Sequence, residues 1–196
     1  MKELEDRIRR EGIVLPGDVL RVDSFINQQI DCEILEKMAQ EWTKAFAKEK
    51  ITKVVTIESS GIAIAYPVAR MLKVPLVFAK KAKSLNLGKD VYTAQVRSYT
   101  QQKVRTSLIE KRFLNKDDRV LLVDDFLANG FAMKGLLSIL DQAGAHCVGI
   151  AVAIEKGYQG GGDELRRAGY PVHSLAIVEK MDEESGEIFF RSADEN

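Results

Sequence analysis

The stretch "VLLVDDFLANGFA", Val120 to Ala132, joins four apolar residues to two adjacent acids, a short turn and what reads as the first turn of a helix. An unbroken apolar run is typical of a strand that is buried on both faces. Asn129 and Gly130 are residues that favour turns. The stretch therefore predicts a strand, a turn and a helix in succession, with Asp124 and Asp125 at the carboxyl end of the strand.

The same alternation of apolar strand and amphipathic helix continues on both sides of this stretch. Further strands are predicted within 53–61, where the strand runs into a tight turn, and at 74–81, 146–156 and 172–180, with 186–190 as an edge strand. Helices are predicted between them, and such alternation indicates a mostly parallel central sheet flanked by helices. We therefore expect an α/β fold in one domain, residues 1–196. Ligands of such folds bind at the carboxyl ends of the strands.

Two segments fit the alternation less well. Residues 1–30 read as a short helix that ends at Gly12, followed by an irregular or hairpin segment with Pro16 and Gly17 before Asp31 caps the next helix. Residues 83–103 are polar and only loosely patterned, which suits a long excursion or a mobile hairpin. Long loops in compact domains are usually functional or disordered.

Composition narrows the class of protein. The chain has 196 residues, and its 29 Lys and Arg balance its 29 Asp and Glu. Zero net charge argues against broad attraction to nucleic acid or to anionic membranes. No apolar run is long enough to span a bilayer, and the charged N-terminus is unlike a secretory signal. Cys32 and Cys147 are too few for a disulfide framework, so we expect a cytoplasmic protein.

The acid pair and the turn that follows suit a sugar phosphate. Backbone amides at a helix N-terminus favour an anion such as phosphate. Two carboxylates would repel that anion, but they can meet hydroxyl groups or a metal ion. An ordinary helix cap is the structural alternative, and for a single Asp it would be preferred. The sequence contains no P-loop and no G-x-G-x-x-G motif, and the later strands lack the Asp of a receiver domain.

The stretch resembles the PRPP-binding motif of type I phosphoribosyltransferases, where PRPP is phosphoribosyl pyrophosphate. The resemblance implies that the loop Ala128, Asn129, Gly130, Phe131 and Ala132 binds the 5-phosphate, and that Asp124 and Asp125 are the catalytic acids at the ribose hydroxyls. "ANGFA" departs from the commoner Thr-Gly-Gly-Thr loop and lacks its hydroxyl donors. The implied fold is the type I phosphoribosyltransferase fold, with a small N-terminal base-binding hood at 1–30 and a flexible loop at 83–103.

The resemblance assigns roles to further positions. Ser59, Ser60 and Gly61 match the loop that handles pyrophosphate, and Lys80 and Lys81 match a basic position at the end of the second strand. Ser98 and Tyr99 fall in the loop that closes over pyrophosphate in the family. Each group also has a plain structural reading, as a turn or as a solvated surface.

The purine base is assigned to three other residues. Leu20 and Asn27 match the N-terminal base-binding segment, and Lys156 matches the purine contact after the fourth strand. The resemblance implies no metal ion held directly by the protein, with Mg²⁺ bound through PRPP, and a homodimer.

"LRVDSFINQQID" and the "EK" that ends the fourth strand resemble the bacterial purine-salvage branch of the family, so the expected reaction is transfer of phosphoribose from PRPP to xanthine. A hypoxanthine–guanine or adenine specificity remains an alternative. A second alternative is a PRPP-sensing transcription regulator on the same fold, although some thirty residues before the core are too few for a winged helix.

Overall fold

An eight-stranded sheet forms the centre of the computed structural model, which describes residues 1–82, 90–97 and 104–191. The strands follow the order β10-β9-β8-β7-β3-β4-β6-β5. Their bounds are β3 Lys53–Ile57, β4 Leu76–Ala82, β5 Val91–Arg97, β6 Val104–Glu110, β7 Arg119–Leu127, β8 His146–Lys156, β9 Val172–Met181 and β10 Ile188–Phe190. A separate two-stranded sheet pairs β1 Ile13–Leu15 with β2 Val19–Arg21.

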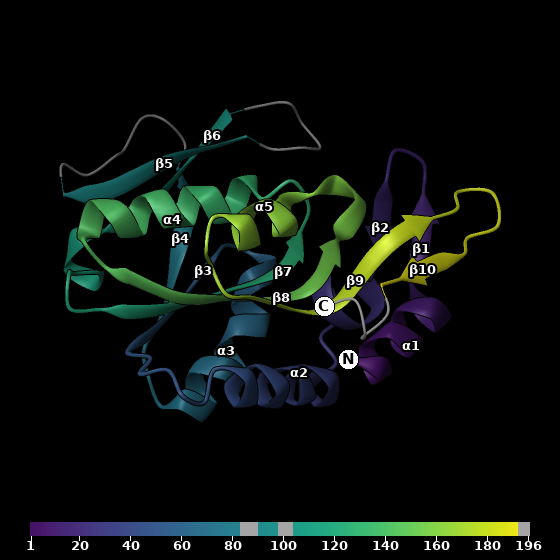
Figure 1. Cartoon of the computed structure of the whole chain (residues 1–196), viewed down its shortest axis with the longest axis horizontal. Coiled ribbons are helices and arrows are strands. Elements are labelled where there is room, and N and C mark those ends of the chain that lie inside the picture. Colours follow the sequence, from purple (N-terminus) through teal and green to yellow (C-terminus); the bar gives the residue numbers. More distant parts are fainter. Residues whose placement is uncertain (83–89, 98–103, 192–196) are drawn as a thin grey trace.

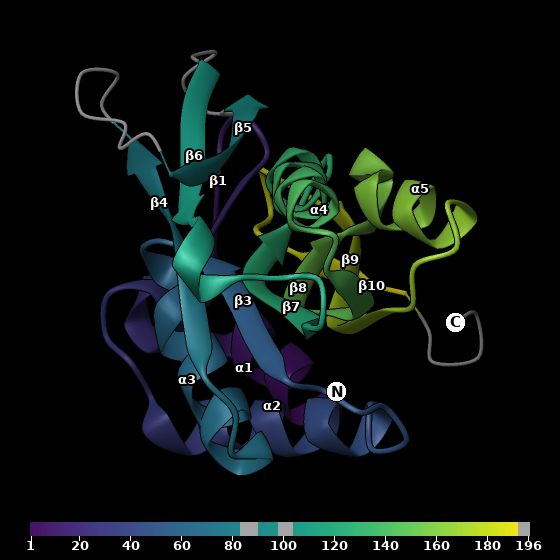
Figure 2. The ribbon, with the colours of Figure 1, turned by 90° about the vertical axis from the view of Figure 1, so that its left-hand side faces the viewer.

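Helices cover both faces of the sheet (Figure 1). The α-helices are α1 Lys2–Glu11, α2 Cys32–Ala45, α3 Ser60–Leu72, α4 Phe131–Ala143 and α5 Gly161–Arg167. Three shorter helical turns are η1 Asp23–Asn27, η2 Lys111–Phe113 and η3 Gly157–Gln159. The first three α-helices lie on one face, and α4 and α5 lie on the other (Figure 2).

The predicted α/β class with a mostly parallel sheet is confirmed. Strands β4, β3, β7, β8 and β9 run parallel to their neighbours in this set. Antiparallel pairing adds β10 at one edge and the β6–β5 pair at the other. The carboxyl ends of the five parallel strands therefore share one edge of the sheet, where the acid pair, Lys80, Lys81 and Lys156 lie.

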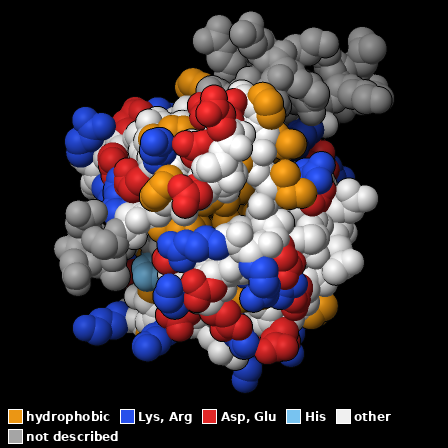
Figure 3. Space-filling view, turned by 90° about the vertical axis from the view of Figure 1, so that its right-hand side faces the viewer, with side chains coloured by type: hydrophobic (Ala, Val, Ile, Leu, Met, Phe, Trp, Pro, Cys, Tyr) orange, Lys and Arg blue, Asp and Glu red, His pale blue; other side chains and the backbone are white. Residues whose placement is uncertain are grey.

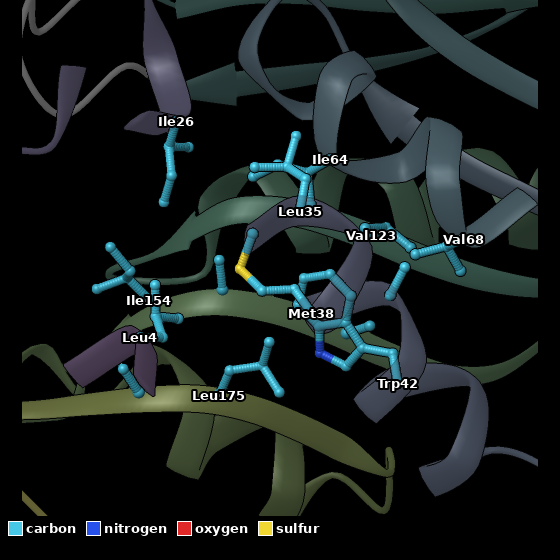
Figure 4. Packing of buried hydrophobic residues seen from close by; sticks show 14 of the residues in the cluster. Leu4, Ile26, Leu35, Met38, Trp42, Ile64, Val68, Val123, Ile154 and Leu175 are labelled. Atoms are coloured by element: carbon cyan, nitrogen blue, oxygen red, sulfur yellow. The ribbon is translucent and has the colours of Figure 1, made fainter. Parts of the chain in front are cut away.

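Two hydrophobic clusters hold the layers together. One cluster packs α1, α2 and α3 against the sheet, and Met38, Trp42, Ile64, Val123 and Ile154 lie close together within it (Figure 4). The second cluster packs α4 and α5 against the opposite face. Buried Val, Leu and Ile side chains on both faces explain why the strand sequences are continuously apolar.

The N-terminal segment forms a helix, a hairpin and a π-helical turn. Helix α1 ends before Gly12 as predicted. Strand β1 pairs with β2 in a hairpin, which was one of the two structures predicted for this segment. Asp31 caps α2, because its carboxylate accepts hydrogen bonds from the amides of Glu33 and Ile34. Both predicted helix boundaries are confirmed.

Two local predictions differ from the structure. Residues 91–97, inside the predicted flexible loop, form the regular strand β5, which pairs along its length with β6. This pairing matches the hairpin alternative, and the alternation of Tyr92, Ala94 and Val96 with polar residues was the available signal for the strand. Pro67 lies in the middle of α3 and not in its first turns. Within the described parts of the chain, no helix has the length and the apolar character needed to cross a membrane.

Candidate active site

The acid pair lies within β7, two residues before its last residue, Leu127. The prediction that the acids end the strand is therefore slightly wrong, because β7 continues to pair with β8 as far as Leu127. Asp124 is only 4% exposed and Asp125 only 8%. The Asp125 amide donates a hydrogen bond of 3.0 Å to Oδ1 of Asp124. Two carboxyl groups are thus held side by side in a buried setting.

Burial and mutual repulsion shape the protonation of this pair. Burial raises the pKa of Asp124 well above its usual value, and the negative charge of Asp125 raises it further. The positive charge of Lys81 acts in the opposite direction, but more weakly. A strongly perturbed carboxyl group at the carboxyl edge of a parallel sheet is a typical feature of a functional site.

The phosphate loop, residues 128–132, leads from β7 into α4. Gly130 precedes the first residue of α4 and has a φ of 79°, a left-handed conformation that glycine adopts without strain. The Asn129 side chain accepts a hydrogen bond of 3.1 Å from the Phe131 amide. The N-terminus of a 13-residue helix therefore opens directly onto this loop, as anion binding requires.

A run of three glycines, Gly160 to Gly162, packs against the backbone of the phosphate loop. This contact was not predicted from the sequence. The Gly161 amide donates to the Ala128 carbonyl at 3.1 Å. A Cβ on Gly161 would lie 2.3 Å from that carbonyl oxygen and 2.5 Å from the Gly130 nitrogen. The run itself was the available signal, since consecutive glycines suggest a close backbone approach.

The predicted pyrophosphate residues lie beside the acid pair. Ser60 and Gly61 begin α3, and Ser59 directly precedes them. A Cβ on Gly61 would lie 2.9 Å from Oδ1 of Asp124, so only glycine allows the start of α3 to approach the acid so closely. The peptide bond between Glu58 and Ser59 is cis.

The predicted lysine pair lies at the end of the neighbouring strand. Lys80 and Lys81 belong to β4 and are exposed. The Glu58 carboxylate accepts a hydrogen bond of 2.6 Å from the Lys81 amide, which links β4 to the turn before α3. Ser98 and Tyr99 lie outside the described residues.

Lys156 lies where the N-terminal hairpin meets the end of β8. Its ammonium group donates a hydrogen bond to the carbonyl of Asp18 in the β1–β2 turn. Burial lowers the pKa of Lys156 below its usual value. The same turn is held by Glu183, which accepts hydrogen bonds from the amides of Gly17 and Asp18. Acidic and basic side chains are interspersed over this face of the molecule (Figure 3).

The other two predicted base contacts are in different surroundings. Leu20 is only 6% exposed and belongs to the core cluster, which leaves little of its side chain to meet a base. Asn27 ends the π-helical turn η1 and is exposed. In the hood segment, Asn27 thus presents a polar side chain at the surface, whereas the side chain of Leu20 packs in the hydrophobic core.

The described ranges 1–82, 90–97 and 104–191 contain no group of three His, Cys, Asp or Glu residues able to hold a metal ion. Asp124 and Asp125 supply oxygen atoms of the kind that Mg²⁺ prefers.

Comparison with known sequences identifies relatives along nearly the whole chain. The model of the phosphoribosyl transferase domain matches residues 22–182. The chain is 55% identical over 193 residues to the xanthine phosphoribosyltransferase of Bifidobacterium adolescentis, covering 98% of this chain and 100% of the relative. It is 47% identical to the xanthine phosphoribosyltransferase of Streptococcus pneumoniae, covering 99% and 100%.

Solved structures show the same fold. An APRTase from Giardia lamblia, in complex with 9-deazaadenine, matches with a TM-score of 0.76 and 26% identity over 90% of this chain and 98% of that one. The adenine phosphoribosyltransferase of Rhodothermus marinus matches with a TM-score of 0.73 and 22% identity over 91% and 100%. Because the family model matches most of the chain, acid pair and phosphate loop included, this protein belongs to the phosphoribosyl transferase domain family.

Proposed function

We propose that this protein transfers the phosphoribosyl group of PRPP to xanthine, giving xanthosine 5′-monophosphate and pyrophosphate. One observation carries the proposal: relatives with the name xanthine phosphoribosyltransferase match the chain at 47–55% identity from end to end. The acid pair beside a helix N-terminus supplies the matching chemistry. Hypoxanthine, guanine and adenine are the competing bases.

The proposed roles follow from the position of each group. Amides of the phosphate loop bind the 5-phosphate, and Asp124 and Asp125 meet the ribose hydroxyls. Lys80 and Lys81, at the end of β4, would face the pyrophosphate. The bond from ribose C1 to pyrophosphate breaks while a purine nitrogen bonds to C1 and the base loses a proton. Positioning and electrostatic stabilisation of the leaving group provide the acceleration.

Mg²⁺ bound to PRPP would neutralise part of the charge of the pyrophosphate. We therefore propose dependence on Mg²⁺ that enters with the substrate.

Base choice is proposed to depend on Lys156 and Asn27. A lysine offers only hydrogen-bond donors, so Lys156 suits the C6 carbonyl of an oxopurine and disfavours the amino group of adenine. Asn27 can donate from its amide to the C2 carbonyl of xanthine. In the free protein the Lys156 ammonium is bound to the carbonyl of Asp18, so contact with a base exchanges one carbonyl acceptor for another.

The test is a steady-state comparison of xanthine, guanine, hypoxanthine and adenine with PRPP and Mg²⁺. We expect the highest kcat/KM for xanthine, and a loss of roughly 10- to 150-fold in Lys156→Ala, which corresponds to about 1.5–3 kcal/mol for a charged hydrogen bond. Binding of PRPP alone should not change in this variant. A higher kcat/KM for any other base contradicts the proposed specificity, and the absence of turnover with every base contradicts the enzyme assignment.

We further propose a homodimeric, cytoplasmic protein that forms one domain, with residues 1–30 as a hood over the base and residues 83–103 as a loop that closes over pyrophosphate. One hydrophobic cluster that includes residues from Leu4 to Ile188 supports the single domain. Light scattering after size exclusion should give twice the chain mass of 21.9 kDa. A mass of one chain would contradict the dimer.

A further inference from the structure

An ion pair between a buried carboxylate and a partly exposed guanidinium, Glu155 with Arg166, lies next to the phosphate loop. Glu155 has no exposed surface, and both of its carboxylate oxygens accept hydrogen bonds from Arg166, at 2.9 and 2.7 Å. The Ser174 hydroxyl donates to the same carboxylate. Two-point contact between guanidinium and carboxylate fixes orientation as well as distance. The pair therefore holds α5, which carries Arg166, in one position against β8.

Glu155 lies next to both parts of the proposed site, the phosphate loop and the base contact Lys156. It is paired in register with Leu127 of β7, the residue that precedes the phosphate loop. It also directly precedes Lys156, the proposed base contact. Because side chains alternate along a strand, Glu155 points toward α5 while Lys156 points toward the hood. A displacement of Glu155 would therefore move both the loop and the base contact.

Two glycines bring α5 into contact with these residues. A Cβ on Gly162 would lie 2.0 Å from Oε1 of Glu155, so the helix backbone rests directly on the carboxylate. Gly161 rests on the backbone of the phosphate loop, as described above. The ion pair thus fixes the position of α5 against β8. Helix α5 in turn fixes the position of the phosphate loop, because Gly161 packs against the loop backbone.

A chain of further ion pairs links Arg166 to the turn that follows Lys156. Arg166 also contacts Asp163 at 3.1 Å, Asp163 contacts Arg191 at 3.4 Å, and Arg191 contacts Glu179. A Cβ on Gly157 would lie 2.8 Å from Oε1 of Glu179 and 3.1 Å from Arg191. The turn that follows Lys156 therefore rests on the far end of the same charged network.

We propose that Glu155 and Arg166 are positioning residues that set the spacing between the phosphate loop and the end of β8 that carries Lys156. The proposal gives the pair no direct contact with either substrate. The spacing that the pair sets affects the binding of a ligand that spans both regions, because such a ligand must contact the loop and the strand end at the same time. This inference rests on the proposed function, since it assigns the 5-phosphate to the loop and the base to Lys156.

The test compares ligands that occupy one region or both. PRPP uses the phosphate loop without the base contact, whereas xanthosine 5′-monophosphate spans both regions. In Arg166→Met we expect the Kd of the nucleotide to rise about 10-fold or more, because small misplacements of bound groups carry large penalties. The Kd of PRPP should change less than about three-fold, because a single-region ligand can follow its own loop. Calorimetry measures both constants.

Arg167→Met is the matched control. Arg167 is the neighbouring residue of the same helix, is exposed, and bonds only the Asp163 carbonyl in the described structure. It should leave both Kd values unchanged. The double variant Glu155→Gln/Arg166→Met removes both charges, so it should melt at a higher temperature than Arg166→Met while nucleotide binding stays weak. Recovery of nucleotide binding together with stability would show a merely structural role and would overturn the inference.

Other outcomes are also decisive. Equal changes for PRPP and nucleotide, or no change for either, would overturn the positioning role. If Arg166→Met does not fold, the same comparison in Arg166→Lys decides, because lysine keeps the charge but lacks the two-point geometry. Wild-type protein that binds PRPP but not the nucleotide would overturn the proposed function, and this inference with it.

Discussion

At the residue scale, we expect Asp124, a proposed catalytic acid, to reduce the stability of the fold at neutral pH. Its raised pKa means that the folded protein favours the protonated form, and this contribution to stability is complete below about pH 4, the usual range for an aspartate. The contribution is lost as the pH rises through the raised pKa. We therefore expect Asp124→Asn to melt at a higher temperature than the wild type at pH 7. The difference should shrink toward pH 4, and turnover should fall.

Asp118 provides the contrasting case for this prediction. It is also buried, but it accepts hydrogen bonds from Lys53 at 2.8 Å and from the Asn115 amide at 2.9 Å. Neutralising it should destabilise the protein by about 1.5–3 kcal/mol, the usual range for a charged hydrogen bond. Thermal unfolding of Asp118→Asn and Asp124→Asn at several pH values measures both effects. A lower melting temperature for Asp124→Asn at pH 7 would refute the assignment of its raised pKa.

Gly130 combines a backbone requirement with a proposed ligand contact. Its φ is 79°, and a residue with a Cβ in this conformation costs roughly 1–2 kcal/mol. Gly144, with a φ of 70° at the other end of α4, has the same requirement away from the site. We expect Gly130→Ala and Gly144→Ala to lose similar stability, while only Gly130→Ala weakens PRPP binding. Equal PRPP affinity in the two variants would show that Gly130 has only a structural role at the start of α4.

At the scale of elements, the β1–β2 hairpin is attached to the sheet by few polar contacts. Glu183 accepts hydrogen bonds from Gly17 and Asp18, and Asp18 in turn accepts from Lys156. Exposed hydrogen bonds contribute about 0.5–1.5 kcal/mol, so Glu183→Ala should raise the KM for xanthine roughly 2- to 12-fold. PRPP binding should be unaffected. Glu184→Ala, next to it on the same turn, is the control, and an equal effect of the two substitutions would argue against the hairpin as a part of the base site.

At the scale of the whole molecule, ligand binding should stabilise the fold by mass action. At 100 times its Kd, PRPP with Mg²⁺ should add about 2.7 kcal/mol to the free energy of unfolding. For a chain of this size, that corresponds to a rise in melting temperature of about 5–10 °C. The rise should be smaller with EDTA, which removes Mg²⁺. A melting temperature independent of PRPP would contradict PRPP binding by the folded state.

Most of the layout could be predicted from local sequence. The apolar runs at 53–57 and 120–123 are typical of buried strands, and Gly144 and Asp31 determine helix ends by their backbone and hydrogen-bonding properties. Strand β5 was missed although Tyr92, Ala94 and Val96 alternate with Thr93, Gln95 and Arg97, because the polar residues on either side of Val91–Arg97 dominate the segment 83–103. Its pairing with β6 is a contact between segments, which local periodicity does not register.

The sequence by itself determined the fold class, the acid pair, the phosphate loop and its glycine, because each depends on residues that are neighbours in the chain. Only the tertiary structure decided which distant groups meet. It placed Gly161 against the phosphate loop, buried Glu155 against Arg166, and brought Asp18 to Lys156. These contacts depend on how strands stack and how helices pack, which arises from burial of apolar surface over the whole chain and not from any local pattern.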